Sequence, residues 1–211
     1  MDKSCFKIIP FFLLIIGLLT YLFFLKMNEA NNYKVQIGIL QKSEADQSYL
    51  LENISIISKL QHYAEGSHLE NYTLYTTTDD SCKLQDLCCS KKLVYYFSEQ
   101  GCKSCYLPFL KKLNDLSDML GKDNVVIICK FTKKRAFHLF IQDLDFKLTP
   151  NVYWSKCDLK IFPEYNDYAL AFWLSSDLII DNVCITDKSN VELSSDYLKI
   201  IENINSCTYE N

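Results

Sequence analysis

The sequence predicts an α/β fold, a central mixed sheet flanked by helices, preceded by one N-terminal transmembrane helix. Three observations lead to this prediction. An uncharged apolar run covers residues 8–25, a strand–helix–strand pattern fills 93–129, and an apolar hairpin followed by a helix occupies 170–203. With 211 residues and 49% apolar content, the chain can fill one core but is short for two full domains. We therefore expect one folded domain.

The apolar run at 8–25 is the predicted membrane segment. Lys3 and Lys7 precede it and Lys26 follows it, with no charge between. At a rise of about 1.5 Å per residue, a helix over this run just spans a bilayer core of roughly 30 Å. A cleaved signal peptide is the alternative, but no pair of small residues follows the run to serve a peptidase. We expect an uncleaved anchor over 1–27.

Residues between the anchor and the folded domain give mixed patterns. The segment 28–70 combines short alternating and weakly helical stretches, so we expect a spacer with partial structure. The folded domain is expected over 71–211. Its first strand is predicted at 71–76, which is rich in strand-forming residues, and 84–87 is expected to form one helical turn.

The strand–helix–strand pattern is the clearest part of the sequence. Residues 93–97 are apolar on both faces, as expected for a central parallel strand. A helix follows and is expected to end at Gly121, and 124–129 form a second buried strand. The apolar residues at helical spacing between the two strands are Tyr106, Phe109, Leu110, Leu113, Leu116 and Leu120. Active sites of open α/β sheets lie at the carboxyl ends of such strands.

Cys102 and Cys105 follow the first strand of this unit, at the predicted start of its helix. The free N–H groups and the positive end of the helix dipole favour a thiolate at Cys102. Cys105, one turn behind, can then resolve a mixed disulfide, so the spacing predicts thiol–disulfide exchange. A structural disulfide or a chance pair is an alternative. Zinc is another, but it generally needs four ligands, and Cys82, Cys88 and Cys89 do not repeat the spacing.

The remaining elements follow in order along the chain. We expect a helix at 133–144, a short strand at 152–154, hairpin strands at 170–174 and 178–185, and a last helix beginning at Ser194 or Ser195 and running through 203. The positions expected to face inward are Phe137, Leu139, Phe140 and Leu144 in the first helix and Tyr197, Ile200, Ile201 and Ile204 in the last.

Ten cysteines are many for a chain of this length, and in an exported protein such a count indicates bridges. Cys129 lies in an apolar run, so we expect an inert core thiol. For Cys82, Cys88 and Cys89 we expect a local structural disulfide in preference to a secondary thiol relay.

The charge balance argues against nucleic acid as a partner. The formal net charge is −4, the isoelectric point is near 5.4, and no basic stripe interleaved with aromatic residues occurs. His62, His68 and His138 are scattered without the spacing of a metal site or a catalytic base. We therefore predict neither a cofactor nor a metal.

Taken together, these residues resemble the thioredoxin superfamily, specifically the membrane-tethered exported thiol–disulfide oxidoreductases similar to cytochrome c biogenesis and thiol-specific antioxidant proteins. The match covers about 71–203, and its most specific parts are 93–105 and 172–179. The resemblance implies a thioredoxin-like sheet, with Cys102 as the nucleophile and Cys105 as the resolving thiol. It also implies protein thiols or disulfides in the exported compartment as partners.

The sequence departs from this family at three positions. Gly101 stands where an aromatic residue usually precedes the first cysteine. Ala169 stands where the family has a cis-proline at the start of the hairpin, and a cis bond before a non-proline costs about 2.5 to 4 kcal/mol, so we expect a trans Tyr168–Ala169 peptide. Tyr96 replaces the buried carboxylate of soluble thioredoxins, and Glu99 is the nearest carboxylate in the sequence.

The function expected from the sequence is disulfide exchange through Cys102 and Cys105 by a single-pass protein of the bacterial inner membrane. Its anchor would be residues 8–25 and its main domain would face the periplasm. The alternative is a redox-inactive thioredoxin-like binding module tethered to the membrane, which Ala169 favours.

Overall fold

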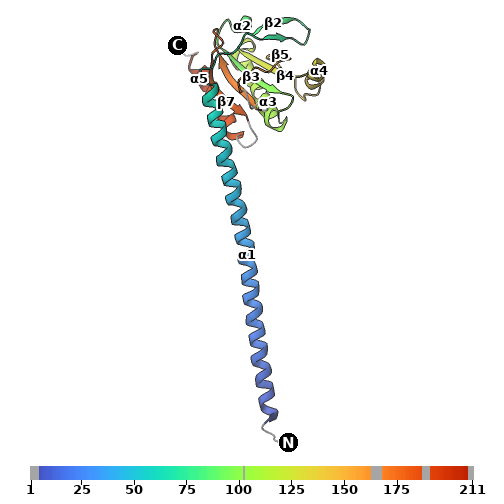
Figure 1. Cartoon of the computed structure of the whole chain (residues 1–211), viewed down its shortest axis with the longest axis vertical. Coiled ribbons are helices and arrows are strands. Elements are labelled where there is room, and N and C mark those ends of the chain that lie inside the picture. Colours follow the sequence, from blue (N-terminus) through green and yellow to red (C-terminus); the bar gives the residue numbers. More distant parts are fainter. Residues whose placement is uncertain (1–4, 102, 163–167, 187–190, 209–211) are drawn as a thin grey trace. The chain divides into compact units, whose positions relative to one another are not determined.

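The structure of the chain is a computed structural model that describes residues 5–101, 103–162, 168–186 and 191–208 (Figure 1). Two compact units are present, residues 1–52 and 53–211. Helix α1 (Cys5–Ala64) accounts for the described part of the first unit and contributes its last turns to the second. Among the described residues, no helix combines the length and the apolar character needed to cross a membrane.

Within the described residues, the second unit contains a seven-stranded mixed sheet in the order β2-β1-β5-β4-β3-β6-β7. Strands β3, β4 and β5 are parallel to one another, whereas β6 and β7 continue the sheet beside β3 in antiparallel pairing. The strands are β1 (Thr73–Tyr75), β2 (Ser81–Lys83), β3 (Lys92–Ser98), β4 (Val125–Lys130), β5 (Asn151–Ser155), β6 (Ala169–Leu174) and β7 (Ile180–Thr186).

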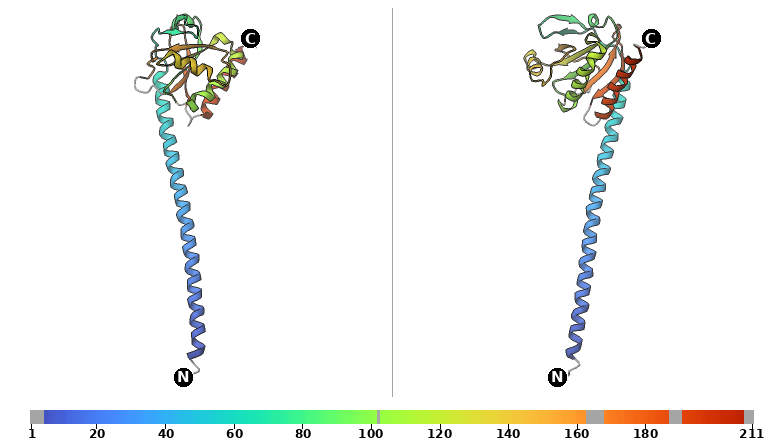
Figure 2. Two further views of the ribbon diagram at one scale, coloured as in Figure 1. Left: turned by 90° about the vertical axis from the view of Figure 1, so that its right-hand side faces the viewer. Right: turned by 180° about the vertical axis from the view of Figure 1, so that it is seen from behind.

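Helices cover both faces of the sheet, so the unit has the thioredoxin-like architecture that the sequence predicts. Helices α3 and α5 lie side by side on one face (Figure 2), where Lys112 Nζ donates to Ser195 Oγ at 3.0 Å. Gly121 has a φ of +85° and ends α3, as predicted. The helices of this unit are α2 (Leu84–Leu87), α3 (Lys103–Leu120), the 3₁₀ turn η1 (Lys122–Asn124), α4 (Lys134–Gln142) and α5 (Val191–Thr208).

The sheet separates two layers of core, which we call the α3 face and the opposite face. The α3 face is packed by α3, α4 and α5 and receives Tyr95 and Phe97 from β3. The opposite face is packed by the last turns of α1, by α2 and by the loop after β5, and receives Val94 and Tyr96. Adjacent residues of β3 therefore enter different cores, because side chains of a strand alternate between the two faces.

The last turns of α1 are part of the folded unit although the sequence assigned them to a spacer. Ile57, Leu60 and Ala64 are buried in the core of the opposite face. Gln61 Nε2 donates to the carbonyl of Val183 in β7 at 2.8 Å, and the Glu65 carboxylate accepts from two backbone N–H groups of β7. The structural unit therefore begins at residue 53.

The predicted strands and helices of the second unit are present, with differences in helix phase. All six apolar positions predicted to face inward from α3 are buried. Leu139 of α4 and Ile200 of α5 are exposed, so both predictions were wrong. The buried stripe of α5 runs through Leu198 and Ile201, and α5 begins at Val191 rather than at a serine cap three or four residues later. The side chain of Ile204 lies outside the described residues.

Candidate active site

A hydrogen-bonded turn joins β3 to α3. Ser98 is buried and accepts two hydrogen bonds in this turn. Its Oγ atom accepts from the N–H of Gln100 at 3.1 Å, and the Ser98 carbonyl accepts from the N–H of Gly101 at 3.0 Å. The N–H of Glu99 donates to the carbonyl of Lys130 at 2.9 Å, which ties the turn to the end of β4. The backbone is thus held up to the residue before the dithiol. Cys102 itself lies outside the described residues.

Cys105 is the third residue of α3 and is half-buried. The next residue, Tyr106, is buried and stacks on Phe97, with ring centroids 4.5 Å apart and planes inclined by 15°. The Phe140 ring of α4 closes the cluster at 5.4 Å from Phe97 and 6.1 Å from Tyr106. This aromatic layer fixes the first turn of α3 against the sheet, and Cys105 with it.

A chain of hydrogen bonds connects the first turn of α3 with the start of β6. The Tyr95 hydroxyl donates to the Tyr106 carbonyl at 3.1 Å and lies 3.2 Å from Thr186 Oγ1. Thr186 Oγ1 in turn donates to the carbonyl of Ala169 at 3.2 Å. The sequence did not single out Tyr95 or Thr186; the only indication for Tyr95 was the pair of tyrosines at 95 and 96 inside an apolar run.

Ala169 is the first residue of β6, as predicted, and it pairs with Thr186 of β7. Its side chain is buried. Among the described peptide bonds none is cis, which confirms the trans Tyr168–Ala169 peptide. The residue that begins β6 therefore presents a trans backbone with a small side chain.

Tyr96 lies on the opposite face, behind the turn that leads to the dithiol. Its hydroxyl is buried next to Asp158 and the backbone of Leu159, and it makes no hydrogen bond of normal geometry to any described residue. Burial raises the pKa of the Tyr96 phenol far above its usual value, and the neighbouring Asp158 carboxylate raises it further. The hydroxyl is therefore neutral at physiological pH.

An ion pair between Lys130 and Asp158 accompanies this tyrosine. Lys130 Nζ lies 2.7 Å from Asp158 Oδ2, and the two side chains are only 19% and 17% exposed. The other carboxylate oxygen of Asp158 accepts from the N–H of Lys160 at 2.7 Å. Because Lys130 pairs with Ser98 across β4 and β3, the ion pair is one strand from the turn before the dithiol. The sequence did not single out either residue of this pair.

Glu99, the carboxylate nearest to Cys102 in the sequence, has a different role. Its Oε1 atom accepts from the N–H of Thr132 at 2.8 Å and from the hydroxyl of the same threonine. Glu99 thus holds the segment between β4 and α4 in place. The carboxylate close to Tyr96 is Asp158 and not Glu99.

The described thiols outside the dithiol differ in exposure: Cys88, Cys129 and Cys184 are buried, Cys82 is half-buried, and Cys89 and Cys157 are exposed. Cys129 is fully buried, as predicted, and burial raises its pKa well above the usual value. Burial also raises the pKa of Cys88 to about 11 and that of Cys184 to about 12. Cys82, Cys88 and Cys89 are unbridged thiols, so the expected local disulfide is not present. Within the described part of the chain, no group of three or more His, Cys, Asp or Glu is arranged to hold a metal ion.

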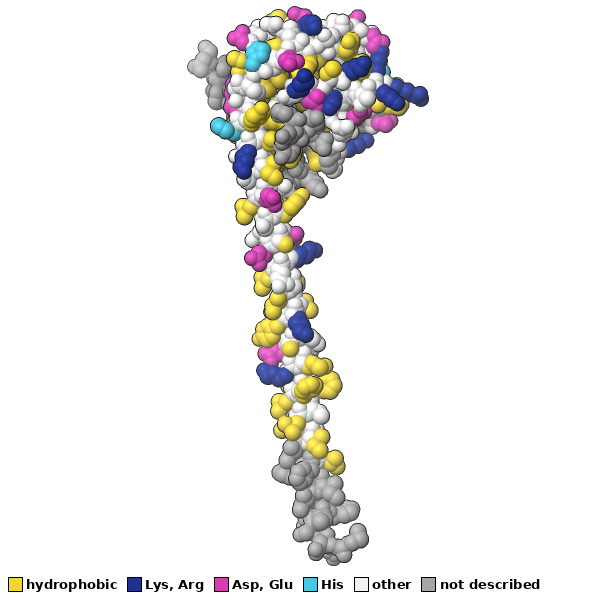
Figure 3. Space-filling model, viewed as in Figure 1, with side chains coloured by type: hydrophobic (Ala, Val, Ile, Leu, Met, Phe, Trp, Pro, Cys, Tyr) yellow, Lys and Arg dark blue, Asp and Glu magenta, His cyan; other side chains and the backbone are white. Residues whose placement is uncertain are grey.

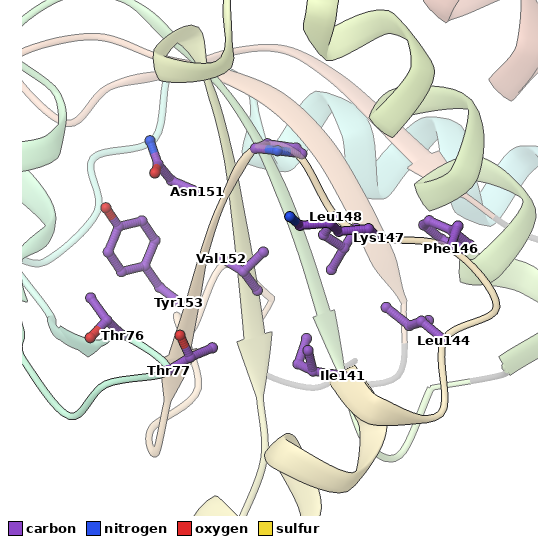
Figure 4. Close-up of a pocket in the computed structure, with 11 residues that line it drawn as sticks. Thr76, Thr77, Ile141, Leu144, Phe146, Lys147, Leu148, Asn151, Val152 and Tyr153 are labelled. Carbon is purple, nitrogen blue, oxygen red and sulfur yellow. The ribbon is translucent and has the colours of Figure 1, made fainter.

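A cavity of about 400 Å³ lies beside β5 (Figure 4). The strand contributes Asn151, Val152 and Tyr153, whose partners in β4 are Val126, Ile127 and Ile128. These positions are toward the amino ends of the parallel strands, whereas the dithiol follows the carboxyl end of β3. The other lining residues are Thr76, Thr77, Ile141, Leu144, Phe146, Lys147, Leu148 and Pro150.

No protein-family model and no curated protein sequence matches this chain. Similar solved structures include a Chlorobium tepidum protein assigned as thiol:disulfide interchange protein DsbE, with 13% identity, coverage of 64% of this chain and 96% of that chain, and a TM-score of 0.48. The exposed lipoprotein thioredoxin of Streptococcus pneumoniae has 16% identity, coverage of 62% and 98%, and a TM-score of 0.45. BsSco, of the Sco family of cytochrome c oxidase assembly proteins, has 14% identity, coverage of 67% and 95%, and a TM-score of 0.46. The thioredoxin-like fold of this chain follows from its own sheet order and helix placement.

Proposed function

We propose that this chain is a membrane-tethered thiol–disulfide oxidoreductase that exchanges disulfides with protein thiols through Cys102 and Cys105. The observation that carries the proposal is the position of Cys105 in the first turn of α3, directly after the turn from the carboxyl end of β3. Cys102 precedes the first residue of that helix in the sequence. A thiolate beside a helix N-terminus is stabilised by the free N–H groups and the helix dipole.

In the proposed reaction, the Cys102 thiolate attacks one sulfur of a partner disulfide. A mixed disulfide forms, and the other partner sulfur leaves as a thiolate that takes up a proton. The Cys105 thiolate then attacks the Cys102 sulfur and releases the second partner thiol. The partner gains two electrons and two protons, and a Cys102–Cys105 disulfide remains. The reverse sequence oxidises a partner dithiol, and the direction depends on the two reduction potentials.

The test uses the full-length chain in detergent and follows the reduction of insulin by dithiothreitol. The wild-type chain is expected to accelerate this reduction, and Cys102→Ser to return it to the uncatalysed rate. In a separate mixture of reduced Cys105→Ser chain and insulin without dithiothreitol, a mixed disulfide through Cys102 is expected to accumulate, because the resolving thiol is absent. The adduct is expected on a non-reducing gel and should disappear on a reducing gel. The matched control is Cys89→Ser, which removes an exposed thiol outside the dithiol and is expected to leave the rate unchanged.

A redox-inactive binding module is the second candidate, and the observation that favours it is Ala169 at the start of β6. The two functions give different results in the same experiment. Wild-type chain that leaves insulin reduction at the uncatalysed rate, together with a Cys105→Ser variant that traps no mixed disulfide, would contradict the exchange reaction and support the binding module.

Residues 8–25 are proposed as the anchor, in the bacterial inner membrane, with the folded unit in the periplasm. The support is the uninterrupted apolar run in the sequence, which as a helix reaches about 27 Å. Expression in bacteria followed by carbonate extraction is expected to leave the chain in the membrane pellet. A variant with Leu18→Lys and Leu22→Lys is expected to be extracted, because each charge is costly in the hydrocarbon core. Protease added to spheroplasts should digest the folded unit, and protection of that unit would contradict the orientation.

A further inference from the structure

Helix α1 exposes many apolar side chains beyond the predicted anchor. Between residues 30 and 51, Leu40 is 68% exposed and Leu51 is 69% exposed, and Tyr33 and Ile37 are exposed as well. Figure 3 shows apolar side chains alternating with charged ones along this helix. Exposed apolar side chains on an isolated helix indicate a missing packing partner.

Of the exposed apolar residues, Tyr33, Ile37, Leu40 and Leu51 lie on one series with intervals of three and four residues, which is the heptad spacing of a coiled coil. The seam runs along one side of α1 for three complete repeats. Its positions are Ala30, Tyr33, Ile37, Leu40, Glu44, Gln47 and Leu51. A strict seven-residue repeat matches a second helix of the same repeat, because supercoiling keeps the two seams in contact. We infer that residues 30–51 of α1 form a parallel two-stranded coiled coil with a second copy of this chain.

Competing alignments of the same helix are less apolar. A seam through Val35 and Ile39 would continue through Lys42 and Asp46 before it reaches Tyr49. Two charged layers in succession would interrupt the apolar contact. The seam that begins at Ala30 has five apolar positions out of seven, and its polar positions are confined to one pair of neighbouring layers.

Charges beside the seam favour a parallel partner. Glu29 flanks the first seam position and Lys34 follows the second. In a parallel, in-register pair these two positions lie next to each other across the interface, so each Glu29 faces a Lys34 of the other copy. Within its own helix Glu29 also contacts Lys26 Nζ at 2.7 Å and the Tyr33 hydroxyl at 3.5 Å. An N-terminal anchor of the kind proposed above imposes the same parallel direction.

The composition of residues 30–51 also indicates that this part of α1 is stabilised by a packing partner. Gly38 and the β-branched residues Val35, Ile37 and Ile39 lower the intrinsic helix propensity. A helix with such residues depends on packing for its stability. Glu44 in the seam places two carboxylates in one layer of the pair, and their repulsion limits the affinity of the dimer.

Matched substitutions on the full-length chain in detergent test the interface by sedimentation equilibrium. Leu40→Asp places a charge in the seam and is expected to weaken the dimer at least about tenfold, whereas Ile39→Asp, one residue away and outside the seam, leaves it unchanged. Glu44→Leu is expected to tighten the dimer. Equal dimer affinity in the wild-type, Leu40→Asp and Glu44→Leu chains, or a wild-type chain that stays monomeric, would overturn the inference.

Crosslinking tests the parallel register in the same preparation. Gln47→Cys lies in the seam and is expected to give a covalent dimer with a short thiol–thiol crosslinker. Lys42→Cys lies on the outer side of the helix and is expected to give no more product than the wild-type chain, which reports the background of the native cysteines. A dimer that crosslinks equally through both positions, or through neither, would overturn the parallel seam. These outcomes do not depend on disulfide exchange, so they stand apart from the test of the proposed function.

Discussion

The two faces of the sheet differ in the hydrogen bonding of their buried polar groups, as the adjacent residues Tyr95 and Tyr96 of β3 show. On the α3 face, the Tyr95 hydroxyl contacts the Tyr106 carbonyl and Thr186 Oγ1. On the opposite face, the Tyr96 hydroxyl has no hydrogen-bond partner among the described residues, and the Lys130–Asp158 ion pair lies nearly buried close by. The helix that carries the dithiol is thus supported by hydrogen bonds of buried hydroxyls, whereas the opposite face holds a buried hydroxyl without a close hydrogen bond beside a nearly buried ion pair.

The two faces therefore contribute differently to the candidate active site: the α3 face fixes the backbone of the first turn of α3, and the opposite face places charged side chains near it. The hydrogen bonds of the α3 face fix the first turn of α3 and link it to the start of β6. The groups of the opposite face contribute charge at the end of β4, one strand from the turn before Cys102. Substitutions on the two faces should therefore have distinguishable effects on stability.

The largest loss of stability is expected when the Lys130–Asp158 ion pair is broken. Lys130→Met leaves the Asp158 carboxylate mostly buried without its cation, and we expect the free energy of unfolding to fall by about 2 kcal/mol. Urea unfolding followed by tryptophan fluorescence measures this, because Trp154 and Trp173 lie in the folded unit. Asp158→Asn in the Lys130→Met background is expected to recover part of the loss. If Lys130→Met alone lowers the free energy of unfolding by less than about 0.5 kcal/mol, the pair contributes no more than a surface ion pair.

A smaller loss is expected for Tyr95→Phe. The substitution removes the hydroxyl that contacts Tyr106 and Thr186 and leaves the ring packed against Phe97 and Phe109. Loss of these buried hydrogen bonds should lower the free energy of unfolding by about 1 to 2 kcal/mol. The rate of insulin reduction should fall as well, since the first turn of α3 loses its tie to the sheet. An unchanged unfolding midpoint would show that these hydrogen bonds do not support the helix.

The smallest effect is expected for Tyr96→Phe, the same chemical change one residue further along β3. Removal of a buried hydroxyl that makes no hydrogen bond of normal geometry relieves a desolvation penalty, so the free energy of unfolding should stay within about 0.5 kcal/mol of wild type or rise. The comparison with Tyr95→Phe is internally matched, because ring size and strand are the same. A loss equal to that of Tyr95→Phe would mean that the two faces do not differ.

Local patterns predicted the elements well where one periodicity dominates. The run 93–97 and the helical spacing up to Leu120 placed β3 and α3 correctly, because each pattern lies within one element. The errors at Leu139 and Ile200 have a different origin. Both helices carry apolar residues on more than one side, so their phase depends on where each helix begins and on the surface it meets.

Predictions were weakest for contacts between residues far apart in the chain. The end of α1 was assigned to a spacer because its partner, β7, lies more than a hundred residues further on. At the candidate site, the sequence predicted Cys102 and Cys105 from their spacing and Ala169 by counting along the hairpin. It pointed to Glu99 as the nearest carboxylate, whereas the loop after β5 brings Asp158 to Tyr96.

The sequence by itself determined the apolar run at 8–25, the strand–helix–strand unit and the two cysteines at the start of its helix. Those features can be recognised from spacings of a few residues, because the spacing of apolar residues indicates whether a segment is a helix or a strand and which side chains share a face. Only the tertiary structure decided that Tyr95 meets Thr186, and that Lys130 meets Asp158 beside a tyrosine without a partner. The register between strands and the path of the loops choose those neighbours, and neither is encoded in a local pattern.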